Sequence, residues 1–371
     1  MLNSIDFSAL LQLAGLGALL AGLALLLLRL RKASPQGRQH ALVVLTLFLT
    51  FDLVLFGAFT RLTDSGLGCP DWPGCYAQAS PIGASTEIAA AQAAMPSGPV
   101  THGKAWIEMI HRYLASAVGV LILVACLSSW RQAGRAGAAS PWWATLTLLW
   151  VSMQGAFGAL TVTMKLFPAI VTLHLLGGMG LLMLLAWQAQ GLHPAPLRLG
   201  RKLYVGAWAL LLLLLLQVAL GAWVSTNYAV LACNEFPTCQ GGQWWPTQDY
   251  KQGFTLWREL GVDADGNWLQ FAALTAIHMA HRLGALLVFT ALLAFALALW
   301  RDGRPTLQVW AKRFLLVAAW QLVTGLSNSV LDWPLLAALA HTGGAAMLLL
   351  LLSLLLARAQ QARQSPIQDN H

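Results

Sequence analysis

Apolar residues gather in nine long runs along the chain, and most of the polar segments between them are short. A helix needs about 20 residues to cross the hydrocarbon core of a bilayer, and each run is close to that length. The pattern therefore predicts an all-α polytopic membrane protein with nine spanning helices. The runs are Ala9–Leu28, Ala41–Thr60, Lys104–Ser128, Pro141–Thr163, Pro168–Gln188, Leu203–Val224, Phe271–Trp300, Val309–Ser329 and Leu335–Ala357.

The composition agrees with a membrane location. Of the 371 residues, 58% are hydrophobic and 10% are charged, whereas soluble chains carry about 25% charged residues. The formal net charge of +8 could indicate a nucleic-acid partner, but the basic residues lie mainly in loops between the apolar runs. We therefore expect contact with membrane lipid and no nucleic-acid partner.

The distribution of Lys and Arg predicts the orientation of the helices. Most of the 22 basic residues fall on one side of the predicted bundle, and that side is normally cytoplasmic. We expect a multi-pass protein of a bacterial inner membrane, with its amino terminus outside and its carboxyl terminus in the cytoplasm. The leading segment 1–6 has no basic residue, and Arg29, Arg31 and Lys32 follow the first run. We therefore interpret that run as a retained anchor helix rather than a signal peptide.

Four landmarks of the chain recur about 165 residues later in the same order, which indicates an internal repeat. They are the segments Gly57–Phe59 and Gly221–Trp223, the loops Cys69–Cys75 and Cys233–Cys239, the segments Ile107–Arg112 and Ile277–Arg282, and the sets Gln154, Gly158, His174 and Gln321, Gly325, His341. The order predicts two parallel four-helix-bundle repeats, related by an axis along the membrane normal. The first repeat spans 41–190 and the second 203–357, with an anchor helix and cytoplasmic linker at 1–40 and a cytoplasmic tail at 358–371.

Two predicted outer loops are long, at residues 61–103 and 225–270, whereas the inner loops are short. Chemistry that needs access from solvent or a partner is therefore expected at the outer face. Within the first of these loops, residues 89–100 are rich in Ala, Pro, Ser and Gly, and we expect them to be flexible.

Four histidines fall inside apolar runs at repeat-related positions, namely His111, His174, His281 and His341. At ~1.5 Å per residue, each lies roughly 10–15 Å below the outer end of its helix. An intramembrane histidine is costly without a polar partner or a metal, and a helix-to-helix hydrogen bond is the alternative reading. Two facing imidazoles without carboxylates or thiolates suit heme iron, whereas zinc would need further ligands. We expect one heme site in each repeat.

Other polar residues lie near these histidines. His278 is one turn before His281 and could be an alternative ligand or a supporting group behind it. Arg112 and Arg282 lie near the outer surface, where each could pair with heme propionates or extend to the membrane interface. No role is assigned to the loop and tail histidines His40, His102, His193 and His371.

Glu108 occupies the position that His278 holds in the second repeat, and it lies one turn from His111. A carboxylate inside a membrane helix is a functional hypothesis by itself. It could act as an acid or a base, or stabilise a cationic intermediate; the alternative is a local ion pair with Lys104. The asymmetry favours a first repeat that reacts and a second repeat that stores electrons or supports the structure.

Each outer loop contains two cysteines six positions apart, and the expected outer compartment oxidises thiols. Disulfides Cys69–Cys75 and Cys233–Cys239 are therefore expected, each worth roughly 2 kcal/mol by loop entropy. The alternative is that one pair cycles between thiol and disulfide. The first pair is then the better candidate, because it adjoins the repeat with the carboxylate. Cys126, inside an apolar run, is expected to be a packing residue.

These residues resemble the heme A synthase family, in its bacterial, cysteine-containing type. The resemblance covers about residues 41–357 and is carried by GAFTRLTDSGLGCPDWPGC (57–75), EMIHR (108–112), QGAFGALTV (154–162), TLHLLGG (172–178), HMAHR (278–282) and ALAHTGG (338–344). The chain departs from the family pattern in its extra amino-terminal helix and in the degenerate second loop, CNEFPTC.

The resemblance implies an oxidoreductase that converts the C8 methyl of heme O to the formyl of heme A for terminal oxidases, by successive hydroxylation and dehydration. It implies that His111 and His174 face the substrate heme, that Glu108 is catalytic, and that His281 and His341 ligate heme b. Heme O synthase and terminal oxidase assembly factors are the partners that this role would bring, and a homo-oligomer is left open.

Two questions remain open from the sequence. A bis-imidazole pocket has no vacant iron position for oxygen, so either one histidine dissociates or the oxygen atom comes from water. The main rival function is a diheme b-type, quinol-linked electron carrier, in which Glu108 would be dispensable. A transporter with parallel repeats would need a polar pathway, and the chain offers few intramembrane polar residues for one.

Overall fold

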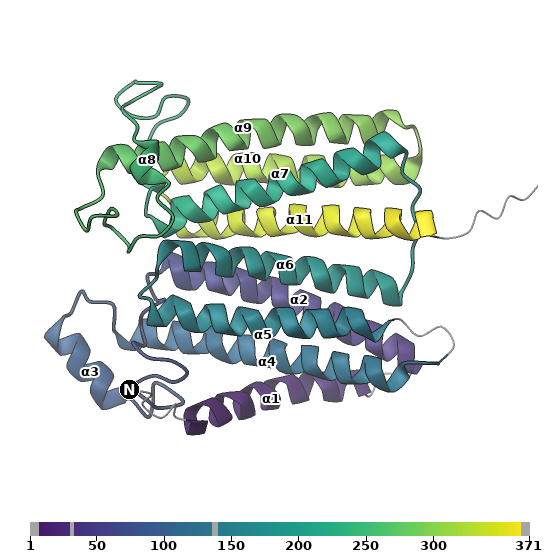
Figure 1. Ribbon diagram of the computed structural model, residues 1–371, viewed down its shortest axis with the longest axis horizontal. Coiled ribbons are helices and arrows are strands. Elements are labelled where there is room, and N and C mark those ends of the chain that lie inside the picture. Colours follow the sequence, from purple (N-terminus) through teal and green to yellow (C-terminus); the bar gives the residue numbers. More distant parts are fainter. Residues whose placement is uncertain (1–6, 30–32, 136–139, 365–371) are drawn as a thin grey trace, which may run out of the picture. The chain divides into compact units, whose positions relative to one another are not determined.

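The computed structural model describes residues 7–29, 33–135 and 140–364, and over these residues the chain consists of helices joined by loops (Figure 1). The helices are α1 (Phe7–Arg29), α2 (Pro35–Leu62), α3 (Ser85–Ala94), α4 (His102–Gln132), α5 (Pro141–Thr163), α6 (Pro168–Leu192), α7 (Arg201–Thr226), the 3-10 helix η1 (Val230–Ala232), α8 (Tyr250–Gly253), α9 (Phe271–Arg301), α10 (Pro305–Val330) and α11 (Leu335–Gln364). The leading segment 1–6, the basic residues Arg31 and Lys32, and the end of the expected tail, 365–371, lie outside the described residues.

Eight helices within the described ranges are long and apolar enough to cross a membrane, namely α1, α2, α4, α5, α6, α7, α9 and α11. This confirms the predicted all-α membrane fold. A helix also forms at α10, where one was predicted, but it falls outside this set. Its sequence includes the charged pair Lys312 and Arg313 and the polar residues Gln321 and Asn328, which lower its hydropathy.

Two helices, α2 and α10, begin several residues before the apolar runs that predicted them. Pro35 and Pro305 stand in their first turns, where the missing N–H of proline costs no helical hydrogen bond. Ser34 caps α2, since its Oγ accepts a hydrogen bond from the Gly37 N–H at 3.0 Å. Polar residues therefore extend these helices beyond their apolar segments.

The described residues form two compact units. The first comprises the residues up to Ile170 together with Gly180–Leu192. In it, α4 contacts α1, α2 and α5, and apolar residues from the second half of α6 join the same core. The approach of α1 to α4 is close, because a Cβ on Gly17 would lie 2.7 Å from Ser116 Cβ. Glycine at this position is what allows the contact.

The second unit comprises Val171–Met179 and the residues from His193 onward. Its helices α7, α9, α10 and α11 form a four-helix bundle, because α7 and α10 each contact both α9 and α11 (Figure 1). Leu292, Phe314 and Leu352, from three of these helices, are fully buried. Apolar packing of this kind supports the polar residues at one end of the bundle, where α8 contacts α9.

Residues 89–100 were expected to be flexible, and for residues 89–94 this expectation is wrong because they belong to α3. Alanine has the highest helix propensity, and α3 is rich in it. The helix is held in place by Ile88, which is fully buried in a cluster with Cys69, Cys75 and Met109. Burial of Ile88 therefore anchors a segment whose composition resembles a linker.

Candidate functional site

The four intramembrane histidines lie on four different helices, with His111 on α4, His174 on α6, His281 on α9 and His341 on α11. Within the second unit, His281 and His341 are close enough to interact electrostatically. The structure therefore brings this predicted pair together. His174 Nδ1 is buried and has no hydrogen-bond partner among the described residues.

Glycines on neighbouring helices make room for three of these imidazoles. A Cβ on Gly221 would lie 3.0 Å from Cε1 of His281, and a Cβ on Gly325 would lie 3.1 Å from Cε1 of His341. In the first unit, a Cβ on Gly57 would lie 3.0 Å from Nε2 of His111. Any larger residue would push against the ring, so these glycines define the ring positions.

The donor set of the second unit fits a heme. Nδ1 of His281 lies 2.9 Å from the amide nitrogen of Gln217, and Nδ1 of His341 lies 3.1 Å from the hydroxyl of Thr324. A histidine that binds a metal commonly has its other ring nitrogen hydrogen-bonded. With Nδ1 hydrogen-bonded in both rings, Nε2 is the ring nitrogen that would bind iron, in the tautomer that carries its proton on Nδ1.

Glu108 is buried on α4 and both of its carboxylate oxygens accept hydrogen bonds. The Cys69 N–H donates to Oε2 at 2.7 Å, and the Arg112 guanidinium donates to Oε1 at 2.5 Å in an ion pair. The alternative pairing with Lys104 does not occur, since Lys104 Nζ donates to the carbonyl of Gly98. The carboxylate thus joins the helix to the cysteine loop.

Arg112 also points into the first cysteine loop rather than away from it. Its Nη1 donates to the backbone carbonyls of Asp71, Pro73 and Gly74, while its Nη2 donates to Glu108. The loop is closed by the Cys69–Cys75 disulfide. The backbone of the loop therefore folds around this guanidinium group.

The carboxylate of Asp71 holds the turn that follows the disulfide. It accepts hydrogen bonds from the N–H groups of Tyr76 at 2.7 Å and Ala77 at 2.6 Å. Both residues have positive φ, 50° and 58°, a region that is unfavourable for residues other than glycine. The hydrogen bonds to Asp71 compensate for this conformation.

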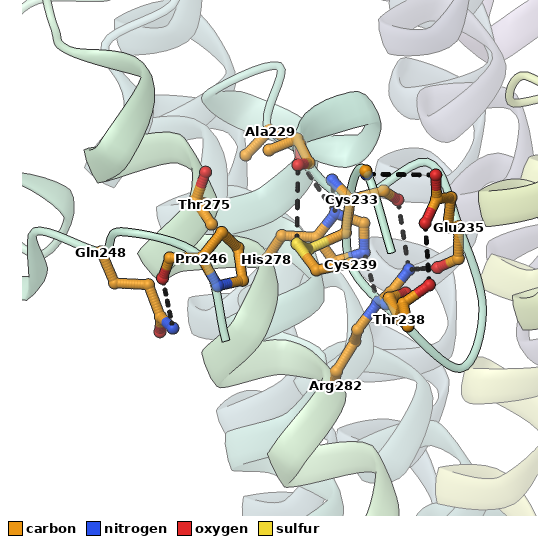
Figure 2. Close-up of a disulfide and its surroundings, with 12 residues drawn as sticks. Ala229, Cys233, Glu235, Thr238, Cys239, Pro246, Gln248, Thr275, His278 and Arg282 are labelled. Carbon is orange, nitrogen blue, oxygen red and sulfur yellow. Dashed lines mark hydrogen bonds between the residues drawn. A yellow bond between two sulfur atoms is a disulfide. The ribbon is translucent and has the colours of Figure 1, made fainter. Parts of the chain in front are cut away.

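The second cysteine loop is built in the same way (Figure 2). A disulfide joins Cys233 to Cys239. Arg282 donates to the carbonyls of Cys233, Glu235 and Thr238 at 3.1, 2.7 and 2.9 Å. The degenerate sequence CNEFPTC therefore keeps the architecture of the first loop.

Glu235 takes the place of Asp71 in this loop. Its carboxylate accepts hydrogen bonds from the N–H groups of Gly241 and Gly242, both of which have positive φ. The bond from Gly242, followed by the bond from the Thr238 hydroxyl, lowers the pKa of Glu235. An acid two positions after the first cysteine thus has the same structural task in both loops.

His278 takes the place of Glu108. Its Nδ1 lies 3.3 Å from the Cys233 nitrogen and 3.1 Å from the Ala229 carbonyl oxygen, and the Nε of Arg282 lies 3.4 Å from its Nε2. Figure 2 shows His278 and Arg282 side by side, facing the disulfide loop from α9. The two positions are structurally equivalent, and they differ in that one side chain is an acid and the other an imidazole.

Several residues of these sites were not identified from the sequence. The acids Asp71 and Glu235 stand at the same place in both CxxxxxC loops, so this shared position is the sequence signal that marks them. Gln217 was missed because the position 164 residues earlier is Leu53, so comparison of the repeats did not reveal it.

Comparison with known proteins agrees with this geometry. The family model described as "Cytochrome oxidase assembly protein" matches residues 40–353. The chain is 38% identical to the heme A synthase of Shewanella oneidensis over 317 residues, which cover 84% of this chain and 93% of that protein. It is also 30% identical to the heme A synthase of Allorhizobium ampelinum, covering 83% and 86%, and 26% identical to that of Geobacillus thermodenitrificans, covering 85% and 89%. The matched family region begins at residue 40, after α1.

Proposed function

Because the chain belongs to the heme A synthase family, we propose that it is a membrane oxidoreductase that converts heme O to heme A for terminal oxidase assembly. The C8 methyl group of heme O becomes a formyl group. This change is a four-electron oxidation that adds one oxygen atom, by successive hydroxylation and loss of water, and it requires an external electron acceptor. We assign different roles to the two four-helix repeats, 41–190 and 203–357.

The second repeat holds heme b in this proposal, with His281 and His341 as axial ligands. Support comes from the fixed Nδ1 atoms of both rings and from the glycines that leave room beside them. A heme bound there supplies one-electron redox chemistry. The protein contributes the ring positions and an apolar surrounding.

The first repeat binds the substrate heme, with His111 and His174 facing it and Glu108 as the catalytic carboxylate. Glu108 accepts hydrogen bonds from a backbone N–H and from a guanidinium. These contacts fix its carboxylate oxygens, where it could act as an acid or a base, or stabilise a cationic intermediate.

One observation carries the assignment of the reactive repeat. Glu108 and His278 occupy equivalent surroundings, each beside the N–H of the first loop cysteine and the arginine four residues later. A purely structural anchor would work equally well in both loops with the same residue. The acid in one repeat and the imidazole in the other therefore favour a chemical role for the acid.

Location and partners follow from the same proposal. The protein lies in a bacterial inner membrane with its amino terminus outside, so that both disulfide loops face the oxidising compartment. Heme O synthase would deliver its substrate, and assembly factors of the terminal oxidase would receive its product. The anchor helix α1 is an addition to the body shared with the family.

The test uses a host that makes heme O but not heme A. Wild-type protein should produce heme A in a pigment extract. Glu108→Gln keeps an oxygen that can accept from the Cys69 N–H, but it removes the charge, so it should retain bound heme and accumulate heme O or a hydroxylated intermediate. The matched variant His278→Gln changes the equivalent loop contact and should still make heme A.

Normal heme A production by Glu108→Gln would remove this residue from the chemistry. A wild type that carries two b-type hemes and makes no heme A would favour the electron carrier instead. Loss of bound heme in Glu108→Gln alone would indicate a structural role for the carboxylate.

A further inference from the structure

Each helix that carries an intramembrane histidine follows another long helix in the chain. On three of these four preceding helices, a glutamine stands four residues before a glycine. The pairs are Gln154 and Gly158 on α5, Gln217 and Gly221 on α7, and Gln321 and Gly325 on α10. Residues four apart lie on one face of a helix. On α7 and α10, the glycine of this face is the one that contacts the imidazole.

The side chain of Gln217 contacts His281 at two points. Its amide nitrogen lies 3.0 Å from the backbone carbonyl oxygen of His281 and 2.9 Å from Nδ1 of the same residue. One turn later, Gly221 leaves space for the edge of the ring that contains Cε1. Two residues of α7 therefore restrict the position of the imidazole, Gln217 at Nδ1 and Gly221 at Cε1.

The contacts between Gln321 and His341 repeat this arrangement. With the amide oriented to satisfy both of its ends, the nitrogen lies 2.9 Å from the His341 carbonyl oxygen and 3.0 Å from Nδ1, and the oxygen accepts from the Ala345 N–H at 2.9 Å. A Cβ on Gly325 would lie 3.1 Å from Cε1 of the same ring. Two helices that are far apart in sequence therefore hold two histidines by the same pair of residue types.

We propose that Gln217 and Gln321 are positioning residues that fix the imidazoles of His281 and His341 for axial ligation of heme iron. The inference rests on the proposed function in one respect, namely that the second repeat holds a heme. Each amide contacts the ring and the main chain of the same histidine, so rotation of the ring is restricted. Nε2 becomes the ligand atom once the ring proton lies on Nδ1.

A glutamine is suited to this position because its amide can either donate or accept. With the amide nitrogen facing Nδ1, the ring proton is on Nε2. A ring that gives the Nε2 electron pair to iron carries its proton on Nδ1, and a half-turn of the glutamine amide then presents Oε1 as an acceptor. The terminal torsion of glutamine is broad and roughly two-fold, but the same half-turn removes the hydrogen bond from the Gln217 amide nitrogen to the His281 carbonyl, so heme binding exchanges one contact for the other. A carboxylate could only accept, and a leucine could do neither.

The first repeat differs at the corresponding position. Four residues before Gly57 stands Leu53, whose side chain has no hydrogen-bonding atom. His111 instead stacks with Phe56, with ring centroids 6.3 Å apart. The first repeat therefore lacks the glutamine on α2, the helix beside His111, and keeps one on α5, Gln154.

The experiment measures heme affinity and the midpoint potential of the full-length protein with bound heme b. Gln217→Leu should lower heme affinity about tenfold, as loss of a group that supports a metal ligand typically does, and should raise the potential. Gln217→Glu should keep the heme, because a carboxylate accepts from Nδ1–H and makes the imidazole a stronger donor. A tenfold preference for ferric iron would lower the potential by ~59 mV.

The matched control is Gln188→Leu, which removes another buried glutamine of a membrane helix. Gln188 accepts a hydrogen bond from Thr147, and this control should leave the heme potential unchanged. Potentials of Gln217→Leu and Gln217→Glu equal to that of the control would overturn the inference, as would a wild type that retains no heme. If the potentials shift but the wild type makes no heme A, the proposed function fails while the positioning role stands.

Discussion

Gly221 on α7 is the most direct point at which to test the packing of His281, which we propose as a heme ligand. In Gly221→Ala, the new Cβ would lie 3.0 Å from Cε1 of His281, whereas carbon atoms in good contact are about 3.5–4.0 Å apart. The ring would have to move by roughly 0.5–1 Å, and overpacking of this kind costs about 1–3 kcal/mol. Alanine in a helix interior gains about 1 kcal/mol over glycine, so the net destabilisation is about 0–2 kcal/mol.

Gly206 on the same helix provides the control. A Cβ there would have its nearest neighbour, Phe295 Cδ2, at 3.7 Å, which is ordinary contact. Gly206→Ala should therefore gain the helix propensity without the crowding and be stabilised by about 1 kcal/mol. The two substitutions are identical in chemistry and differ in whether an imidazole stands opposite.

The assay is the retention of heme by the purified protein, followed through its absorbance during heating. Only the crowding cost of about 1–3 kcal/mol acts on the ligand ring, so heme affinity in Gly221→Ala should fall by up to roughly 5–150-fold relative to Gly206→Ala. Equal heme retention and equal spectra in the two variants would refute the packing argument, because the added methyl group would then have displaced no ligand.

Two further predictions concern the cysteine loops. Asp71→Ala removes two charge-assisted hydrogen bonds to Tyr76 and Ala77, each worth about 1.5–3 kcal/mol, and should make the Cys69–Cys75 disulfide open to a thiol reductant more quickly, as measured by alkylation. The pKa of Glu235 is lowered, so its ionised form stabilises the second loop. This stabilisation is complete above the usual glutamate pKa and is lost as the pH falls through the lowered pKa. Glu235→Gln should abolish this pH dependence in loop tryptophan fluorescence.

Much of the fold could be predicted because membrane spans obey one strong rule. Each of the nine predicted runs became a helix whose apolar core lies where it was expected. The rule depends on local composition and on the length of a span, both visible in the sequence. It does not apply outside the bilayer, so α3 was missed, since its position depends on how Ile88 packs among residues distant in sequence.

The site could be predicted in part, for a similar reason. The four histidines and Glu108 stand out because polar residues are rare in apolar helices. The partners of these residues do not stand out. Arg112 and Arg282 were considered for heme propionates, but their guanidinium groups donate to loop carbonyls, and only the folded loop reveals these acceptors.

The equivalence of the two loops also bears on the charges around the two histidine sites. In the first repeat, the charge of Arg112 is paired with Glu108. In the second, Arg282 contacts the imidazole of His278 and interacts electrostatically with His281. Two sites with the same ligand type therefore differ by about one unit of nearby charge.

An uncompensated positive charge favours the reduced form of a redox centre, because it stabilises the added electron. On the proposed function, the second repeat would therefore be the better electron acceptor of the two, as an oxidation carried out in the first repeat requires. The Glu108→Gln variant would leave Arg112 without its counter-charge and make the two repeats electrostatically alike. Its loss of activity would then have two physical sources, the missing proton acceptor and the missing difference in charge. The double variant with Arg112→Gln removes the unpaired charge without restoring a base, and Arg112→Gln alone controls for the loop contacts that this change removes.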